Sequence, residues 1–286
     1  MPDADLAAAA DSSRQGRLRR DAYDRYLDLF GRQVFDFLRG LRGVGAFALI
    51  TLGVGLRKVG VARQVIRPLV ARETVRSGLQ LLPMFLFVAV ALGFLIIGQA
   101  VSWLSRVGTT DLLGSLMVIV VVRELGPLLT AFLVLARAGS ANVVELGTAR
   151  ATGEVESLEA LGIDPVHYLV LPRVIGMMAG VFSLTVYVIL GALVSGYVWA
   201  FLQDVPLLPG EYFSQLAGAL SYLDFMLLAL KTSVFGFIIA ITTCYHGLAQ
   251  PLHLEEVPRA TVRAVAQCVI CCVFVDALFI VIYLLV

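Results

Sequence analysis

Five long apolar stretches dominate the larger, C-terminal part of the chain. They cover roughly residues 79–104, 112–136, 166–202, 220–245 and 262–286. Each contains at least the ~20 residues that a helix needs to cross the hydrocarbon core of a bilayer. The pattern predicts an all-α, polytopic membrane protein with five transmembrane helices.

Basic residues indicate which side of the membrane faces the cytoplasm. A dense basic stretch precedes the first crossing, with Arg57, Lys58, Arg63, Arg67, Arg72 and Arg76. The connections around 137–173 and 246–263 also carry arginines, namely Arg137, Arg150, Arg173, Arg259 and Arg263. Because cytoplasmic loops are enriched in Lys and Arg, these segments are placed inside. Five crossings then put the C-terminus on the outside.

The segment before the first crossing has a different pattern. Residues 1–20 are Ala-rich and charged, without the basic start and apolar centre of a signal peptide, and we expect a disordered extension. From 21 to 42 apolar residues recur every three or four positions opposite charged ones, which predicts an amphipathic helix in the membrane interface. The apolar run 44–56 is too short to cross and predicts a re-entrant elbow. The expected organisation is therefore an extension at 1–20, an interfacial helix and elbow at 21–76, and a five-helix domain at 77–286.

The second apolar stretch contains two charges near its middle, Arg123 and Glu124. Each would cost about 2.5 to 3.5 kcal/mol at the centre of a membrane helix unless it found a partner or water. Pro127 follows, and it lacks the N–H that would bond the carbonyl of Arg123 in an α-helix. The sequence therefore predicts that buried charge, a freed carbonyl and a kink in the helix coincide here.

Two further charges, Lys231 and Asp276, lie inside the fourth and fifth stretches. Counting ~1.5 Å per helical residue places all four charges at similar depth, in the outer half to the middle of the membrane. They could form ion pairs that lock three helices together. They could instead line a cavity, open to the outside, that accepts an amphiphile with a zwitterionic or anionic head. The sequence favours the cavity, since intramembrane charges usually face an interior or a pathway.

A short amphipathic helix is predicted at 153–161, between the second and third stretches. Val155, Leu158 and Leu161 are spaced three apart, with Glu154, Glu156, Ser157 and Glu159 on the other faces. Thr152 is expected to cap its beginning, and Gly162 its end. Such a helix could rest on the membrane surface or contact a partner protein, and physical chemistry alone favours the membrane surface.

Small residues gather in the third stretch, including Gly176, Gly180, Gly191, Ala192, Ser195 and Gly196. Such residues let helices approach closely. They fit packing within the chain or a dimer interface, and packing within the chain is the simpler expectation.

Composition and missing motifs narrow the function. The chain of 286 residues is 59% hydrophobic and only 15% charged, and its mean hydropathy of +0.89 excludes an ordinary soluble domain. A net charge of +1 gives no case for a nucleic-acid partner, and the four Cys residues behave as small apolar residues. No G-x-x-x-x-G-K-[ST], H-E-x-x-H or G-x-S-x-G motif occurs. We therefore expect no enzymatic activity, and any energy must come from an ion gradient or another subunit.

Several short motifs occur in order from about residue 77 to the C-terminus. They are Arg123 to Pro127, Ala136 to Ala141 with Glu145 to Thr148, Glu154 to Glu159, Gly162 to Pro165, Leu171 to Arg173, Lys231 to Gly236, Arg259 to Val265 and Asp276 to Leu278. With these motifs the chain resembles the MlaE/YrbE permease family. The extension at 1–20 has no counterpart in that pattern.

The resemblance implies the permease of an ABC transporter for phospholipids in a bacterial inner (cytoplasmic) membrane. Such a permease is a homodimer with cytoplasmic ABC ATPase subunits, which bind ATP and Mg²⁺, and a periplasmic MCE-domain protein; this chain itself would hold no cofactor. The helix at 153–161 would be the coupling helix, in which Glu154, Val155, Glu156, Leu158 and Glu159 contact the ATPase. Arg123, Glu124, Lys231 and Asp276 would line the lipid cavity.

Two other functions fit the residues alone. The chain could be an ion-coupled transporter or channel that uses Glu124 and Asp276 as proton sites. It could also be an intramembrane scaffold without a transport role. Transport that follows a pH gradient without ATP would favour the first, and normal lipid distribution after deletion would favour the second.

Overall fold

A computed structural model describes residues 39–55, 57, 63–107, 113–202, 209–249 and 253–285. The chain divides into two compact units, residues 1–46 and 47–286, and the fold described below is that of the second. The extension expected at 1–20, and the interfacial helix as far as residue 38, lie outside the described residues. Residues 39–55, which include the expected elbow at 44–56 except for its last residue, are helical.

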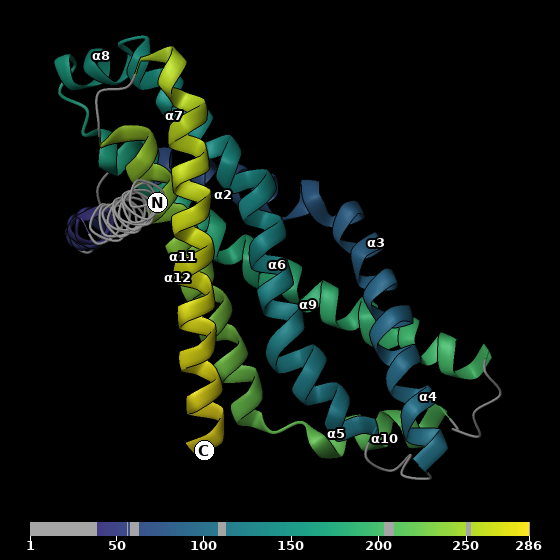
Figure 1. Cartoon of the computed structure of the whole chain (residues 1–286). Helices are drawn as coiled ribbons and strands as arrows, with labels where there is room; N and C mark the ends of the chain where they lie inside the picture. Colours follow the sequence, from purple (N-terminus) through teal and green to yellow (C-terminus); the bar gives the residue numbers. More distant parts are fainter. Residues whose placement is uncertain are drawn as a thin grey trace, which may run out of the picture. The chain divides into compact units, whose positions relative to one another are not determined.

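Every regular element in the described part of the chain is helical (Figure 1). Five helical stretches are long and apolar enough to cross a membrane: Ile66–Leu104, Gly114–Ala151, Val166–Leu202, Tyr222–Leu248 and Leu254–Leu285. The predicted all-α fold with five membrane helices is therefore confirmed. The third stretch has the predicted bounds, and the other four are longer than predicted. They extend mainly at the ends that the sequence assigns to the cytoplasmic side, because the helices continue past the apolar core into polar residues.

These stretches are built from shorter elements. The first contains α2 (Arg63–Ser77), α3 (Leu82–Leu92) and α4 (Gly98–Val107), and the second contains α5 (Leu113–Met117), α6 (Gly126–Val134) and α7 (Ser140–Ala151). The third, fourth and fifth are essentially α9 (Leu171–Leu202), α11 (Tyr222–Leu248) and α12 (Val257–Leu285). Two short helices join them, α8 (Glu154–Ala160) before α9 and α10 (Pro209–Ala219) after it. In Figure 1, α8 and α10 lie at opposite ends of the spans.

Helix α9 packs against α2, α3 and α11, and its small residues make this possible. Gly176 lies against Glu73 of α2, Gly180 against Ser77, and Gly191 against Ala89 of α3. The Ser77 hydroxyl donates a hydrogen bond of 3.0 Å to the Gly176 carbonyl, which ties the two backbones together. The small-residue stripe is therefore used for packing within the chain.

Replacing Gly176 by alanine is expected to separate α2 from α9. The added Cβ would lie 2.7 Å from the Glu73 Cβ and 3.0 Å from backbone atoms of Glu73 and Thr74, so a helix must shift. We expect a loss of about 1–3 kcal/mol, the usual cost of overpacking a filled site. Thermal unfolding in detergent measures it, with Gly218→Ala as control because nothing lies within 4 Å of a Cβ at that position. Equal melting temperatures for the two variants would contradict this account of the packing.

The second span departs from regular α-helical geometry near Pro127, where the sequence predicts a kink. Residues Val118–Leu125 form π-helical turns, and the Gly126 N–H bonds the carbonyl of Val121, five residues back. Pro127 then stands in the first turn of α6, where its missing N–H is tolerated. Such π-turns inside helices often occur at functional sites. Arg123 and Glu124 lie within these turns, and both form ion pairs with residues of α11.

The ends of α8 confirm one predicted cap and correct the other. Gly162 has a positive φ of 76°, and its N–H bonds the Glu159 carbonyl at 2.9 Å, as expected of a C-terminal cap. The prediction that Thr152 caps the beginning is wrong. Its hydroxyl bonds the Thr148 carbonyl at 3.0 Å, because α7 extends to Ala151 and Thr152 closes that helix. Gly153, with φ 79°, makes the turn into α8.

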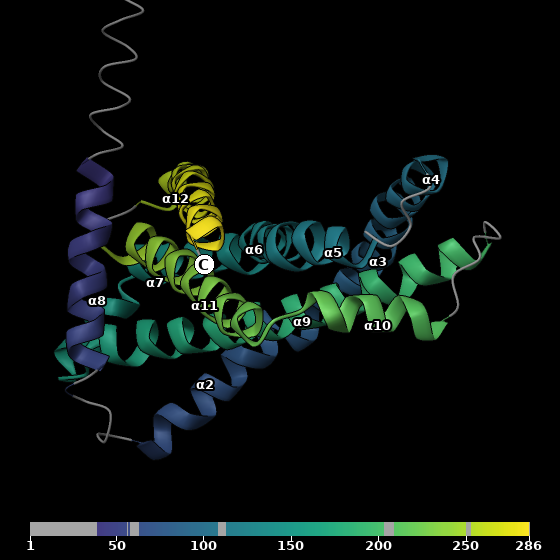
Figure 2. The same cartoon turned by 90° about the horizontal axis from the view of Figure 1, so that it is seen from below.

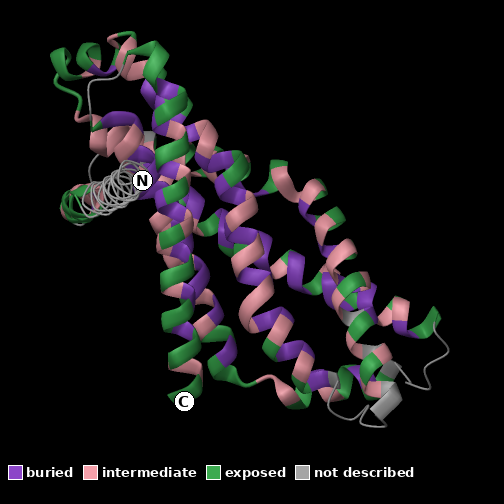
Figure 3. Cartoon of the chain, in the orientation of Figure 1, coloured by how far each residue is buried: buried purple, intermediate pink, exposed green. Residues whose placement is uncertain are grey.

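Burial separates the faces of the helices. Figure 3 shows buried residues concentrated where the helices meet and exposed residues along the outer side of α12. α12 packs against α11 and α7, and its other faces are apolar and exposed, with residues such as Phe274 and Val281. A membrane helix has this character where it meets lipid. Seen from below in Figure 2, α6, α11 and α12 lie side by side, which agrees with their contacts.

Candidate functional site

Lys231 of α11 joins the second, fourth and fifth spans. Its side chain is 0% exposed, and its Nζ lies 3.1 Å from Glu124 Oε2 and 2.7 Å from Asp276 Oδ1. An ammonium surrounded by two carboxylates satisfies the requirement that charges inside a membrane find partners. Three of the four predicted charges are thus brought into direct contact.

The same ammonium also uses the carbonyl freed by Pro127. Lys231 Nζ donates to the backbone oxygen of Arg123 at 2.8 Å. In an α-helix that oxygen would accept from the nitrogen of residue 127, which in proline carries no hydrogen. The Arg123 carbonyl, which Pro127 leaves without a helical N–H donor, is therefore a third acceptor for the buried lysine.

The side chain of Arg123 has a separate partner, which the sequence did not predict. Its Nε lies 2.9 Å from Asp224 Oδ1, and its guanidinium carbon lies 4.9 Å from the centre of the Tyr283 ring. Asp224 is buried near the start of α11, where its other oxygen accepts from the Ser221 N–H at 2.9 Å. The Ser-x-x-Asp spacing is a capping signal, and it could have located Asp224. It could not have shown that the carboxylate also holds Arg123.

These five charged residues differ in how far their side chains are exposed. We call Arg123, Glu124, Asp224, Lys231 and Asp276 the midspan cluster. The side chains of Lys231 and Asp276 are 0% and 10% exposed, whereas those of Arg123 and Glu124 are 28% and 27% exposed. The contacts lock three helices together, and Arg123 and Glu124 still present polar surface that a ligand can contact.

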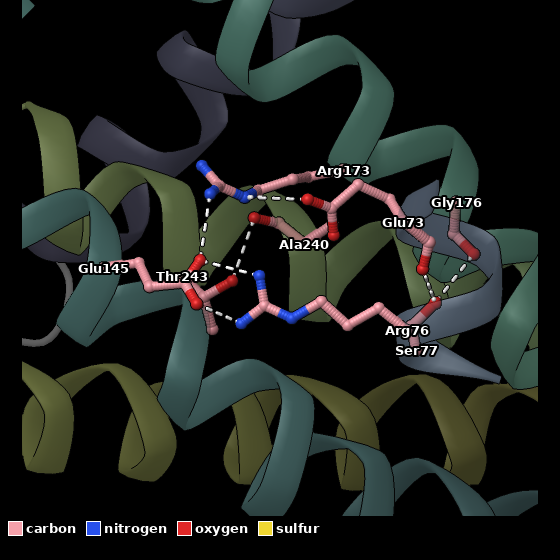
Figure 4. Close-up of polar contacts among 8 residues, drawn as sticks. All are labelled: Glu73, Arg76, Ser77, Glu145, Arg173, Gly176, Ala240 and Thr243. Atoms are coloured by element: carbon pink, nitrogen blue, oxygen red, sulfur yellow. Dashed lines mark hydrogen bonds and ion pairs between the residues drawn. The ribbon is translucent and has the colours of Figure 1, made fainter. Parts of the chain in front are cut away.

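A second group of charges lies at the ends of the spans that the sequence assigns to the cytoplasmic side, and Figure 4 shows it. We call it the inner group. Glu73 and Arg76 of α2, Glu145 of α7 and Arg173 of α9 alternate in sign. Arg76 forms a two-pronged ion pair with Glu145, whose Oε2 accepts from Arg76 at 2.7 Å and from Arg173 at 3.1 Å. Arg173 Nε also lies 3.7 Å from Glu73. The sequence indicated Arg76 and Arg173 only as markers of the cytoplasmic side, because spacing along one helix does not reveal partners on another.

Two members of the inner group, Glu145 and Arg173, line a cavity beneath α8. The cavity has a volume of about 440 Å³, and its lining includes Glu145, Arg173, Glu154, Val155 and Leu158. Val155 is only 2% exposed, so it anchors α8 to the chain itself. Glu154, Glu156 and Glu159 are exposed, and Glu156 pairs with Arg150 at 3.2 Å. The outer surface of α8 is therefore acidic, with Leu161 exposed beside its end.

Comparison with known proteins places this arrangement in a family. The family model described as "Permease MlaE" matches residues 70–282. A "Probable ABC transporter permease protein" of Rickettsia felis is 29% identical over 83% of this chain and 89% of its own length. The "Intermembrane phospholipid transport system permease protein MlaE" of Haemophilus influenzae is 28% identical over 85% of this chain and 91% of its own length.

A plant protein is also similar over a shorter part. "Protein TRIGALACTOSYLDIACYLGLYCEROL 1, chloroplastic" of Arabidopsis thaliana is 28% identical over 67% of this chain and 55% of its own length. The family model includes all five residues of the midspan cluster and the whole of α8. The chain belongs to the MlaE permease family.

Proposed function

We propose that this chain is the permease subunit of an ABC transporter that moves phospholipids between a bacterial inner membrane and a periplasmic MCE-domain carrier. The names of the Haemophilus and Rickettsia relatives support a phospholipid substrate and an ABC transporter. In this proposal two copies form a homodimer, and a separate cytoplasmic ATPase binds ATP and Mg²⁺. The observation that carries the proposal is the partly exposed pair Arg123 and Glu124 in the middle of an apolar span.

The midspan cluster would receive the lipid headgroup. A guanidinium is a strong partner for a phosphate, and a carboxylate for an ammonium group. Arg123 and Glu124 would contact the headgroup, because they keep exposed surface beside apolar residues that suit the acyl chains. Lys231 and Asp276, which are buried, would hold Glu124 and the π-helical turn in place. A headgroup bound in this way leaves no charge unpaired inside the membrane.

Helix α8 would transmit the movement of the ATPase to the membrane spans. Its exposed acidic residues Glu154, Glu156 and Glu159 would contact the ATPase, with Leu158 partly accessible and Val155 holding α8 on the permease. Closure of the ATPase subunits on nucleotide would push the two α8 helices together. Because α8 connects the second span to the third, this movement would narrow the lipid cavity. Lipid would then pass between the cavity and the MCE carrier.

Native mass spectrometry of the complex extracted from membranes, combined with lipid transfer in vesicles, tests the proposal. We expect two copies of this chain with ATPase subunits and bound phospholipid, and transfer that requires ATP. Transfer that follows a pH gradient without ATP would instead support the ion-coupled transporter with Glu124 and Asp276 as proton sites. A lone chain without ATPase or lipid would contradict the proposal.

A further inference from the structure

Asp224 changes the charge balance of the midspan cluster. The sequence indicated two cations and two carboxylates inside the spans, and the structure adds Asp224 to them as a third carboxylate. With every side chain in its usual charged form at neutral pH, the five residues carry three negative charges and two positive ones. One negative charge of the cluster is therefore left without a cation of its own among these residues.

The contacts show which carboxylate this is. Arg123 and Asp224 form one pair, with 2.9 Å between Arg123 Nε and Asp224 Oδ1. The ammonium of Lys231 is shared, because it lies 2.7 Å from Asp276 Oδ1 and 3.1 Å from Glu124 Oε2. Asp276 makes the shorter contact, and its side chain is 10% exposed against 27% for Glu124. Glu124 is therefore the carboxylate whose charge is least compensated and easiest for a ligand to reach.

The carboxylate of Asp224 is fixed beside Arg123. Its side chain is 4% exposed, and its other oxygen accepts a hydrogen bond from the Ser221 N–H at 2.9 Å. The Tyr283 ring lies over the guanidinium, with 4.9 Å between the ring centre and the guanidinium carbon. With Nε paired and one face covered, Arg123 keeps its two Nη groups for a ligand. Asp224 already offsets the charge of this guanidinium.

The two exposed groups therefore have different requirements. Arg123 has its own counter-ion, so it can hydrogen-bond a phosphate without depending on that phosphate for charge balance. Glu124 shares its cation with Asp276 and gains a full counter-ion from a ligand that carries one. We propose that the midspan cluster selects headgroups with an ammonium group, and that Glu124 and Asp224 set this preference. The inference rests on the proposed function and narrows its substrate to zwitterionic phospholipids.

An anionic headgroup would add negative charge to a site that already has an excess of it. Like charges repel more strongly in an apolar environment than in water, because the dielectric constant is lower. A zwitterionic headgroup instead brings its phosphate to Arg123 and its ammonium group to Glu124, so each part meets an opposite charge. Discrimination of this kind comes from repulsion of the wrong ligand as well as attraction of the right one.

Competition between two lipids for the full chain tests the inference. The chain is placed in nanodiscs with equal amounts of phosphatidylethanolamine and phosphatidylglycerol that carry the same acyl chains. It is then released into mild detergent, and native mass spectrometry counts the lipids that stay bound. We expect bound phosphatidylethanolamine to exceed phosphatidylglycerol at least about tenfold, which corresponds to 1.4 kcal/mol. Equal binding would overturn the inference and leave the lipid site of the proposed function standing, whereas no bound lipid would overturn both.

Two variants assign the preference to its residues. Asp224→Asn removes the third carboxylate and keeps an oxygen that can accept from the Ser221 N–H. Cations and carboxylates are then equal in number, so phosphatidylglycerol binding should rise and the ratio of the two lipids should fall towards one. Glu124→Gln removes the accessible carboxylate itself and should also lower the ratio; it decides the matter if Asp224→Asn does not fold.

The control is Glu211→Gln, which neutralises an exposed acidic residue of α10 and should keep the preference of the unchanged chain. A ratio that stays the same in both Asp224→Asn and Glu124→Gln, with their melting temperatures retained, would overturn the inference. The same fall in Glu211→Gln would also overturn it, because the preference would then follow the total charge of the chain.

Discussion

Replacing Lys231 by alanine is expected to abolish phospholipid transport and to destabilise the chain by about 3 kcal/mol or more, the cost of leaving a buried charge unpaired. The change removes the ammonium that contacts Glu124, Asp276 and the Arg123 carbonyl. Two carboxylates then face each other in the apolar interior without a cation between them. Thermal unfolding in detergent and ATP-driven lipid transfer measure the two losses. Arg259→Ala, at an exposed position, is the control and should change neither.

A neutral version of the site separates structural support from lipid binding. Lys231→Met combined with Glu124→Gln and Asp276→Asn keeps the volumes and removes the charges. Replacing a whole buried ion-pair group is often neutral or stabilising, so the melting temperature should return towards that of the unchanged protein. Transport should stay absent, since Glu124 no longer offers a carboxylate to the headgroup. Full transport in this variant would mean that the midspan cluster only holds the helices together.

Reversing the charge of α8 is expected to detach the ATPase. Glu154→Lys with Glu159→Lys changes two exposed residues of a helix that Val155 anchors from its other face, so the fold should persist. Like charges brought together at an interface cost several kcal/mol. We therefore expect at least about a tenfold loss of ATPase in the purified complex, since 1.4 kcal/mol corresponds to a factor of ten.

A matched reversal at another inner position distinguishes docking from a general charge effect. Glu255→Lys changes an exposed acidic residue in the 3₁₀-helical turn Leu254–Glu256, directly before α12. This variant should retain the ATPase and transport at normal levels. If the α8 reversal also retained the ATPase, α8 would not be the docking surface, and the proposed route of force to the lipid cavity would be wrong.

The membrane spans and the charges within them could be predicted from the sequence because both are properties of one helix at a time. Length and hydropathy identify a span without its neighbours, and depth follows from counting residues. The helix irregularity at Pro127 could also be predicted from one helix alone. These features were enough to predict that Lys231, Glu124 and Asp276 lie at a common depth. In the structure the three side chains are in contact.

Partners on different helices could not be predicted in the same way. Whether Asp224 or another carboxylate pairs with Arg123 depends on how α11 is rotated against the second span, and spacing along one helix does not contain that angle. The same holds for Arg76 and Glu145. Gly176 and Gly180 predicted close packing without naming the partner, because a stripe of small residues fits any helix. Thr152 was assigned to the wrong helix since a threonine at such a boundary can close one helix or begin the next.

Photolabelling with a phospholipid that carries a photoreactive headgroup tests the central claim most directly. Headgroups of ordinary bilayer lipids stay at the surface, so labelling at mid-depth requires a polar site there. Phe274 is the internal comparison, because its side chain is exposed on the apolar face of α12 and it is only two residues from Asp276. Mass spectrometry should find adducts within one turn of Arg123 and Glu124 and none at Phe274. Adducts absent from the second span, or equal at Phe274, would contradict a headgroup site at the midspan cluster.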